Sequence, residues 1–220
     1  MSGKMLKSKK HVFWEAFIIT VVIFLAGLFL GMLIEASNSN QIANLYTQSE
    51  ISLTDATTTS RLTEEFKFDC DAIKDANIKF ANQIYEEAKL LERYEESGKL
   101  TETMTLLHKK YDLLRTLLWT SNQKSLWRCD NYNLIVYLYE YKSEDTDKKA
   151  VQNVWSKILL DLRAQEDNIL LLPIAADQNL TSLGLLVEEY GVTQFPAIVI
   201  NNKQVLYELE STNTIEEFLN

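Results

Sequence analysis

The sequence predicts a fold of class α+α/β, with one N-terminal transmembrane helix, a long antiparallel helical hairpin and a C-terminal α/β domain. An uninterrupted apolar segment near the N-terminus indicates the first part, and apolar residues at helical spacing indicate the second. After about residue 131, strand-like and helix-like segments alternate. Only 6 Gly and 2 Pro occur in 220 residues, which disfavours an all-β fold with many tight turns.

Residues 1–11 form a basic tail with four lysines and no acidic residue. Residues 12–34 form an apolar segment, and at about 1.5 Å per residue such a helix spans the roughly 30 Å hydrocarbon core of a membrane. A cleaved signal peptide is the alternative, but its apolar region would be shorter and Ile34-Glu35-Ala36 is a poor cleavage site. We therefore expect a single-pass transmembrane helix.

The four lysines precede the apolar segment and Glu35 follows it, so the positive-inside rule places the N-terminus in the cytoplasm and residues 35–220 outside the cell membrane. The net charge of −9 opposes binding to phosphate, so no nucleic-acid partner is expected. The expected partners are the membrane and either another protein or a second copy of the chain. Gly27 and Gly31 have the spacing of a helix-pairing motif, although lipid-facing glycines are the simpler explanation.

Residues 35–60 are rich in Ser, Thr, Asn and Gln, which is typical of a polar stalk. Residues 61–129 predict a helical hairpin. Apolar residues from Leu62 to Leu91 recur at steps of three, four or seven, the spacing of one helix face. Ser97-Gly98 should end this helix, and a second amphipathic helix follows. The two helices must pack antiparallel, because neither can bury its apolar face alone.

Cys70 and Cys129 are the only two cysteines of the chain. They lie at similar distances from Gly98 along the chain, so antiparallel packing brings both to the open end of the hairpin. An exterior location would be oxidising, and we therefore expect a disulfide between them. The alternative is a pair of free buried thiols, which behave as small hydrophobic side chains.

His108, Asp112 and Arg115 share one face of the second helix. A catalytic histidine with its carboxylate is one interpretation, but mixed charges are common on helix surfaces, and we expect a solvated face. The five glutamates between residues 86 and 96 have no histidine among them, so they also predict a solvated surface and not a metal site. We expect no catalytic residue, no cofactor and no metal.

The C-terminal region predicts alternating strands and helices. The strands are 133–141, 169–175, 197–200 and 204–209, and the helices are 148–164, 182–190 and 214–219. The first strand, helix and strand imply a right-handed crossover between parallel strands. Asn201-Asn202 tolerates positive φ and predicts a tight turn between the last two strands.

The segment YGVTQFPAIVINNK, which begins at Tyr190, gives residues 131–220 a resemblance to the thioredoxin-like superfamily. Pro196 matches the family's cis-proline before a hairpin. The family's redox centre is a Cys-x-x-Cys after the first strand of this region, where Ser143 and Thr146 occupy the two cysteine positions. The resemblance therefore implies the fold without the redox activity. The whole chain also resembles uncharacterised membrane proteins of small-genome archaea, which implies no function.

These observations favour a redox-inactive interaction or structural module of the cell envelope, which would hold a protein or an extended peptide beside Pro196. The alternative is an envelope thiol-disulfide oxidoreductase that uses Cys70 and Cys129. Acidic residues flank Cys70 on both sides, and they oppose formation of the thiolate that this alternative requires. Asn179 begins a glycosylation sequon on the expected outer side.

Overall fold

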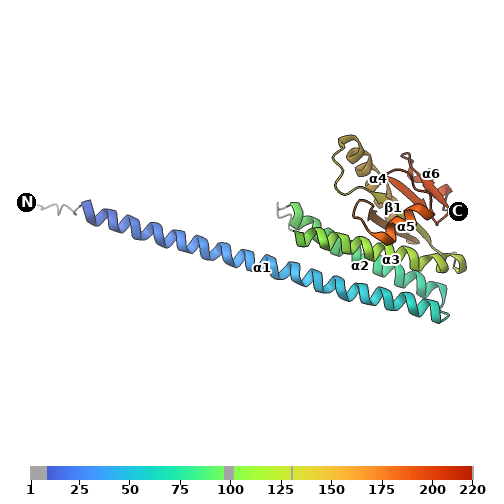
Figure 1. Ribbon diagram of the computed structural model, residues 1–220, viewed down its shortest axis with the longest axis horizontal. Helices are drawn as coiled ribbons and strands as arrows, with labels where there is room; N and C mark the ends of the chain where they lie inside the picture. Colours follow the sequence, from blue (N-terminus) through green and yellow to red (C-terminus); the bar gives the residue numbers. More distant parts are fainter. Residues whose placement is uncertain (1–8, 97–101, 130, 220) are drawn as a thin grey trace, which may run out of the picture. The chain divides into compact units, whose positions relative to one another are not determined.

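The computed structural model describes residues 9–96, 102–129 and 131–219 (Figure 1). The helices are α1 Lys9–Glu65, α2 Cys70–Glu96, α3 Glu102–Arg128, α4 Thr146–Gln165, α5 Thr181–Glu189 and α6 Thr212–Glu217. The strands are β1 Asn133–Tyr139, β2 Ile169–Ala175, β3 Ala197–Ile200 and β4 Gln204–Leu206. The chain divides into two compact units, one up to residue 47 and one from residue 48 onward.

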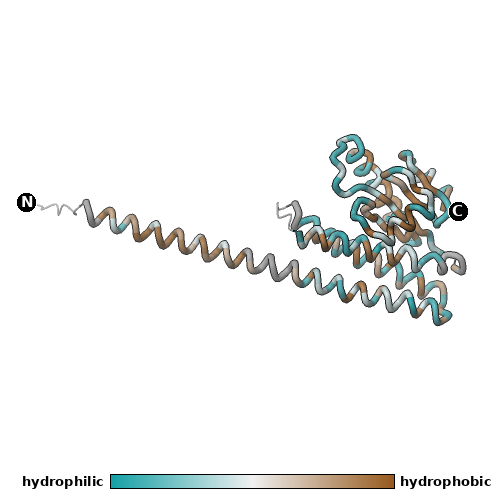
Figure 2. Tube along the Cα trace, viewed as in Figure 1, coloured by the Kyte–Doolittle hydropathy of each residue, from teal (hydrophilic) through white to brown (hydrophobic). Residues whose placement is uncertain are grey.

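The first unit contains the N-terminal part of α1. Its segment Val12–Ile34 is one helix of 23 residues with exposed apolar side chains, and it is long and apolar enough to cross a membrane. Figure 2 shows this part of α1 as mainly hydrophobic. A signal sequence would have the same appearance. Most of the expected basic tail, residues 1–8, lies outside the described residues.

The segment 35–60, expected as a polar stalk, is helical throughout. From residue 48 it belongs to the second unit, where α1 lies beside α2 and α3 (Figure 1). Its buried face carries small side chains at helical spacing, namely Ser49, Ser52 and Ala56. Gln83 Nε2 of α2 donates a hydrogen bond of 3.1 Å to Ser52 Oγ, and Lys110 of α3 pairs with Glu50. The hairpin therefore has a third helix along one side.

The helix expected to run unbroken from Leu62 to Leu91 is interrupted, and that expectation is wrong. Helix α1 ends at Glu65 and α2 begins at Cys70. Asp69 Oδ2 accepts a hydrogen bond of 3.2 Å from Asp71 N, which caps the new helix. The apolar spacing continues across the break, so periodicity alone did not reveal it. The expected C-terminal cap at Ser97-Gly98 lies outside the described residues.

Helices α2 and α3 form the expected antiparallel hairpin (Figure 1). A disulfide joins Cys70, at the start of α2, to Cys129, which follows α3. The two Cα atoms are 5.5 Å apart, so the prediction of a bridge at the open end is confirmed. Asn77 Nδ2 of α2 also donates a 2.7 Å hydrogen bond to Asn122 Oδ1 of α3.

The strands form one mixed sheet in the order β2-β1-β3-β4. Strands β1 and β2 are parallel, and β3 is antiparallel to both β1 and β4. Strand β1 ends at Tyr139, two residues before the expected end. The reason is that Asp177 accepts hydrogen bonds from the backbone N–H groups of Tyr141 (3.0 Å) and Lys142 (2.8 Å), which draws the chain away from the sheet.

The hairpin between β3 and β4 turns at Asn201 and Asn202, whose φ angles are 49° and 57°. Lys203 N donates to Ile200 O at 2.9 Å and closes the turn, as the sequence predicted. Strand β4 ends at Leu206 instead of residue 209, so this hairpin is shorter than expected.

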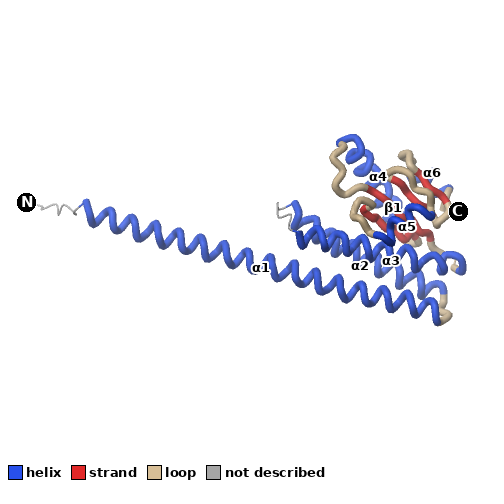
Figure 3. Tube along the Cα trace, in the orientation of Figure 1, coloured by secondary structure: helices blue, strands red, loops and turns tan. Residues whose placement is uncertain are grey.

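The sheet is buried on both faces, with helices on either side (Figure 3). Leu134, Val136 and Leu138 point to a core shared with α3 and α5, while Ile135 and Tyr137 point to a core shared with α4 and α6. The hairpin (61–129) and the α/β region (131–220), which the sequence suggests as separate domains, therefore share one hydrophobic core.

Candidate functional site

The loop that leads from β1 into α4 contains Ser143 and Thr146, the two positions compared above with a pair of cysteines. Ser143 is buried, and Thr146 is the exposed first residue of α4. Asp145 is the N-cap, and its Oδ1 atom accepts hydrogen bonds from Asp147 N (2.9 Å) and Lys148 N (3.1 Å). The carboxylate satisfies the free N–H groups at the start of the helix, so this loop is explained by helix capping.

The other two positions singled out from the sequence lie apart from this loop along the chain. Pro196 directly precedes β3, its bond to Phe195 is cis, and its side chain is buried. It therefore offers little open surface for an extended peptide. Asn179 is exposed between β2 and α5 and has a positive φ of 52°, so its side chain is accessible for modification.

The disulfide lies at the edge of the core between the hairpin and the sheet. Cys129 is 2% exposed and belongs to that core, and the partly buried Cys70 packs against it. The bridge therefore ties the start of α2 to the segment that leads into β1. Both sulfur atoms are used in this covalent bond.

The prediction that His108, Asp112 and Arg115 form a solvated helix face is wrong. All three side chains are less than a tenth exposed. Helix α3 lies against the end of β2, where Ala175 N donates a 3.1 Å hydrogen bond to Asp112 Oδ1. The ring of His108 lies 4.5 Å from that of Tyr141, measured between centroids. Helix spacing shows which residues share a face, but it does not show whether another layer covers that face.

The buried carboxyl of Asp112 is in a high-energy environment for a charge. Desolvation raises its pKa to about 6, although Arg115 and the backbone N–H of Ala175 act in the opposite direction. Arg115 Nη1 lies 3.3 Å from Asp112 Oδ1. Among the described residues, Asp112 Oδ2 has no hydrogen-bond partner. The pair therefore consists of a permanent cation and a carboxyl whose pKa is raised to about 6.

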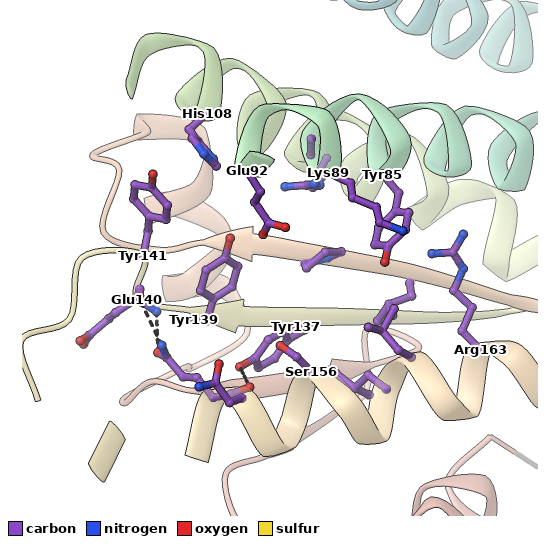
Figure 4. Close-up of a pocket in the computed structure, with 18 of the residues that line it drawn as sticks. Tyr85, Lys89, Glu92, His108, Tyr137, Tyr139, Glu140, Tyr141, Ser156 and Arg163 are labelled. Atoms are coloured by element: carbon purple, nitrogen blue, oxygen red, sulfur yellow. Dashed lines mark hydrogen bonds between the residues drawn. The ribbon is translucent and has the colours of Figure 1, made fainter. Parts of the chain in front are cut away.

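A cavity of about 450 Å³ lies beside this pair, between α2 and α3 on one side and α4 on the other (Figure 4). The end of β1 and the middle of β2 form its floor. Its aromatic lining consists of Tyr85, Tyr137, Tyr139 and Tyr141. The rings of Tyr137 and Tyr139 are stacked, with centroids 5.5 Å apart. A cavity of this size and lining is typical of small-molecule sites.

Hydrogen bonds hold the floor of the cavity in place. Gln152 of α4 accepts from Glu140 N at 2.8 Å and donates to Glu140 O at 3.0 Å, and both bonds appear as dashed lines in Figure 4. The Tyr137 hydroxyl donates to Gln152 O at 3.0 Å. Burial raises the pKa of Tyr139, with a further contribution from the nearby Asp112, so its hydroxyl stays protonated at neutral pH.

Sequence reasoning did not find this cavity, because its lining comes from five separate elements. One signal was present: Tyr137, Tyr139 and Tyr141 alternate along the expected strand 133–141, a pattern that directs polar-tipped aromatic rings to one face of a strand. Comparisons with protein-family models, curated proteins and solved structures find no match. The function is therefore inferred from the chemistry of the site.

Proposed function

We propose that this protein is a membrane-anchored binding module with a thioredoxin-like α/β domain that has no redox centre. In this proposal the N-terminus is cytoplasmic, and residues 35–220 are outside the cell. The module would hold a ligand, a protein partner or a second copy of the chain without transforming it.

Three features support the thioredoxin-like assignment of residues 131–220. The sheet order is β2-β1-β3-β4, with a parallel β1–β2 pair joined through α4. The last two strands form a hairpin, and Pro196 stands immediately before it. These are the features on which the resemblance depends, and helices cover both faces of the sheet.

The redox-silent loop is the observation that carries the proposal. Ser143 and Thr146 provide hydroxyl groups where the family's chemistry needs a pair of thiols, and hydroxyls do not exchange with disulfides. The adjacent Asp145 carboxylate accepts from the backbone N–H groups that would otherwise stabilise a thiolate. A module with this loop can bind a partner but cannot reduce it there.

The competing proposal, an oxidoreductase that uses Cys70 and Cys129, has less support. Thiol–disulfide exchange requires a sulfur atom that an incoming thiolate can reach. Cys129 is 2% exposed and packs in the core between hairpin and sheet. A bridge in this position acts as a structural tie.

Insulin reduction by the full chain in lipid nanodiscs tests this proposal. A small dithiol is added as the electron donor, and we expect no insulin reduction above the rate that this dithiol gives without the protein. The Ser143→Cys/Thr146→Cys variant is the matched control, because it restores two thiols to the loop and shows whether the assay detects such a centre. Reductase activity of the wild-type chain that disappears in Cys70→Ser would support the oxidoreductase instead.

Protease treatment of intact cells tests the topology. A C-terminal tag should be removed and an N-terminal tag should be protected, because the four early lysines oppose translocation. The reverse pattern would contradict the proposed orientation. Crosslinking in the same cells should show the chain joined to another protein or to a second copy.

A further inference from the structure

The lining of the cavity has a charge opposite to that of the whole chain. The protein has a net charge of −9, but the fully charged side chains around the cavity are mainly cationic: Lys89, Arg115, Lys149 and Arg163 against Glu92 and Glu140. Glu140 is already paired with Lys148 at 2.8 Å. Although Asp112 offsets part of the charge of Arg115, the lining has more cations than carboxylates, and such an excess of positive charge in a concave site concentrates anions.

Arg115 is the cation best placed to select such a ligand. It is 7% exposed and lines the cavity. Within the described part of the chain, its only hydrogen bond runs from Nη1 to Asp112 Oδ1. A guanidinium has five N–H donors in a planar fork, so donors remain for a ligand. This fork matches the two oxygen atoms of a carboxylate.

The rest of the lining favours a flat organic body. The stacked rings of Tyr137 and Tyr139 form an aromatic wall, and the Arg163 guanidinium lies 4.9 Å from the centre of the Tyr85 ring opposite. Figure 4 shows the Tyr139 side chain directed from β1 toward Glu92 of α2. Glu92 opposes a second negative charge at this end, which favours a monoanion over a phosphate dianion.

We propose that this cavity binds a small planar organic monocarboxylate, whose carboxylate group is held by Arg115 and whose ring lies against Tyr137 and Tyr139. The inference rests on the proposed binding function and adds the chemical class of the ligand. Lys89 and Lys149, which are exposed at the rim, attract the anion before it enters.

Calorimetric titration of the full chain in phosphatidylcholine nanodiscs tests this, with empty nanodiscs as the blank. The probes are 2-naphthoate, its neutral isostere 2-naphthamide, and 2-naphthyl phosphate. We expect 2-naphthoate to bind about 10- to 100-fold more tightly than the amide, as a charge-assisted hydrogen bond implies. We also expect it to bind more tightly than the phosphate. Equal binding of acid and amide, or no binding of the acid, overturns the proposal, and a preference for the phosphate overturns the carboxylate assignment.

Variants identify the residue that holds the anion. Arg115→Gln combined with Asp112→Asn removes both charges and keeps polar side chains at both positions, and this variant should lose the preference for 2-naphthoate over the amide. Lys157→Gln is the matched control, because Lys157 is exposed on α4 and does not line the cavity. A folded double variant that keeps the preference contradicts the role of Arg115. If it does not fold, the acid and amide comparison on the wild-type chain still decides the proposal.

The same nanodiscs are assayed for insulin reduction, so the two proposals fail separately. No binding of 2-naphthoate together with no reductase activity overturns only the ligand class. Reductase activity of the wild-type chain overturns the proposed function, whatever the titration shows.

Discussion

Replacing Cys70 and Cys129 with serine should destabilise the protein without abolishing its fold. The bridge joins residues 59 positions apart, so in the unfolded chain it closes a long loop. A cross-link removes conformational entropy from the unfolded state, and its loss therefore favours unfolding. The hydrophobic core between hairpin and sheet is still present in the variant, so the native state should persist at room temperature.

The chain-entropy relation allows the size of this effect to be estimated. For the 59-residue separation it gives a loss of about 4 kcal/mol in the free energy of unfolding at 25 °C. For a domain of this size, about 4 kcal/mol corresponds to a fall in Tm of roughly 10 °C. Both figures are upper values if the unfolded chain keeps residual structure.

Urea unfolding of the full chain in a mild non-ionic detergent measures the difference. Trp119 and Trp155 are both 0% exposed, and they lie in the two cores on opposite faces of the sheet, so tryptophan fluorescence reports on both. Reduction of the wild-type chain should reproduce the curve of the double serine variant. The variant itself should not respond to reductant, which is the internal control.

A difference of less than about 1 kcal/mol in the free energy of unfolding between the wild-type chain and the variant would refute the reasoning, since even a short closed loop contributes more than this in the chain-entropy model. Separate unfolding of the hairpin and the sheet after reduction would refute a different step, namely that one hydrophobic core joins them without the bridge.

Asp112→Asn should change the pH dependence of stability. Because burial raises the pKa of Asp112 from 3.8 to about 6, the wild-type chain should lose up to about 3 kcal/mol of stability relative to the variant as pH rises from about 4 to 6. Arg115 is present in both proteins, and unfolding free energies that change in parallel across this pH range would contradict the prediction. Asn202→Ala should lower the free energy of unfolding by about 1 to 3 kcal/mol, because alanine has no polar side chain to stabilise a φ of 57° and loses the 2.7 Å hydrogen bond to a buried indole. Asn202→Gly loses the same hydrogen bond but adopts a positive φ without strain, so it should cost less in chemical denaturation. The opposite order would exclude backbone strain as a cause. Asp145→Ala should lower the free energy of unfolding by about 0.5 to 2 kcal/mol, because α4 loses its N-cap. Glu144→Ala is the control and should leave the thermal midpoint unchanged. Equal effects of the two substitutions would argue against capping.

Several parts of the structure followed from local patterns in the sequence. The apolar run Val12–Ile34 is long enough to cross a membrane, and β2 and β3 have the predicted bounds. The Cys70–Cys129 bridge was also predicted, because helix spacing and one turn define which residues meet at the open end of a hairpin. Each of these depends on residues that are neighbours along the chain or across one hairpin.

Other parts were decided only by tertiary structure. The polar segment that contains Ser49 and Ser52 became a packed helix, because its small side chains permit close approach to the hairpin. Helix α3 is covered on more than one side, so Asp112 and Arg115 are buried although their spacing resembles that of a solvated face. The cavity exists because five elements meet around it. Burial depends on what covers a face, and the residues that cover these faces are distant in sequence.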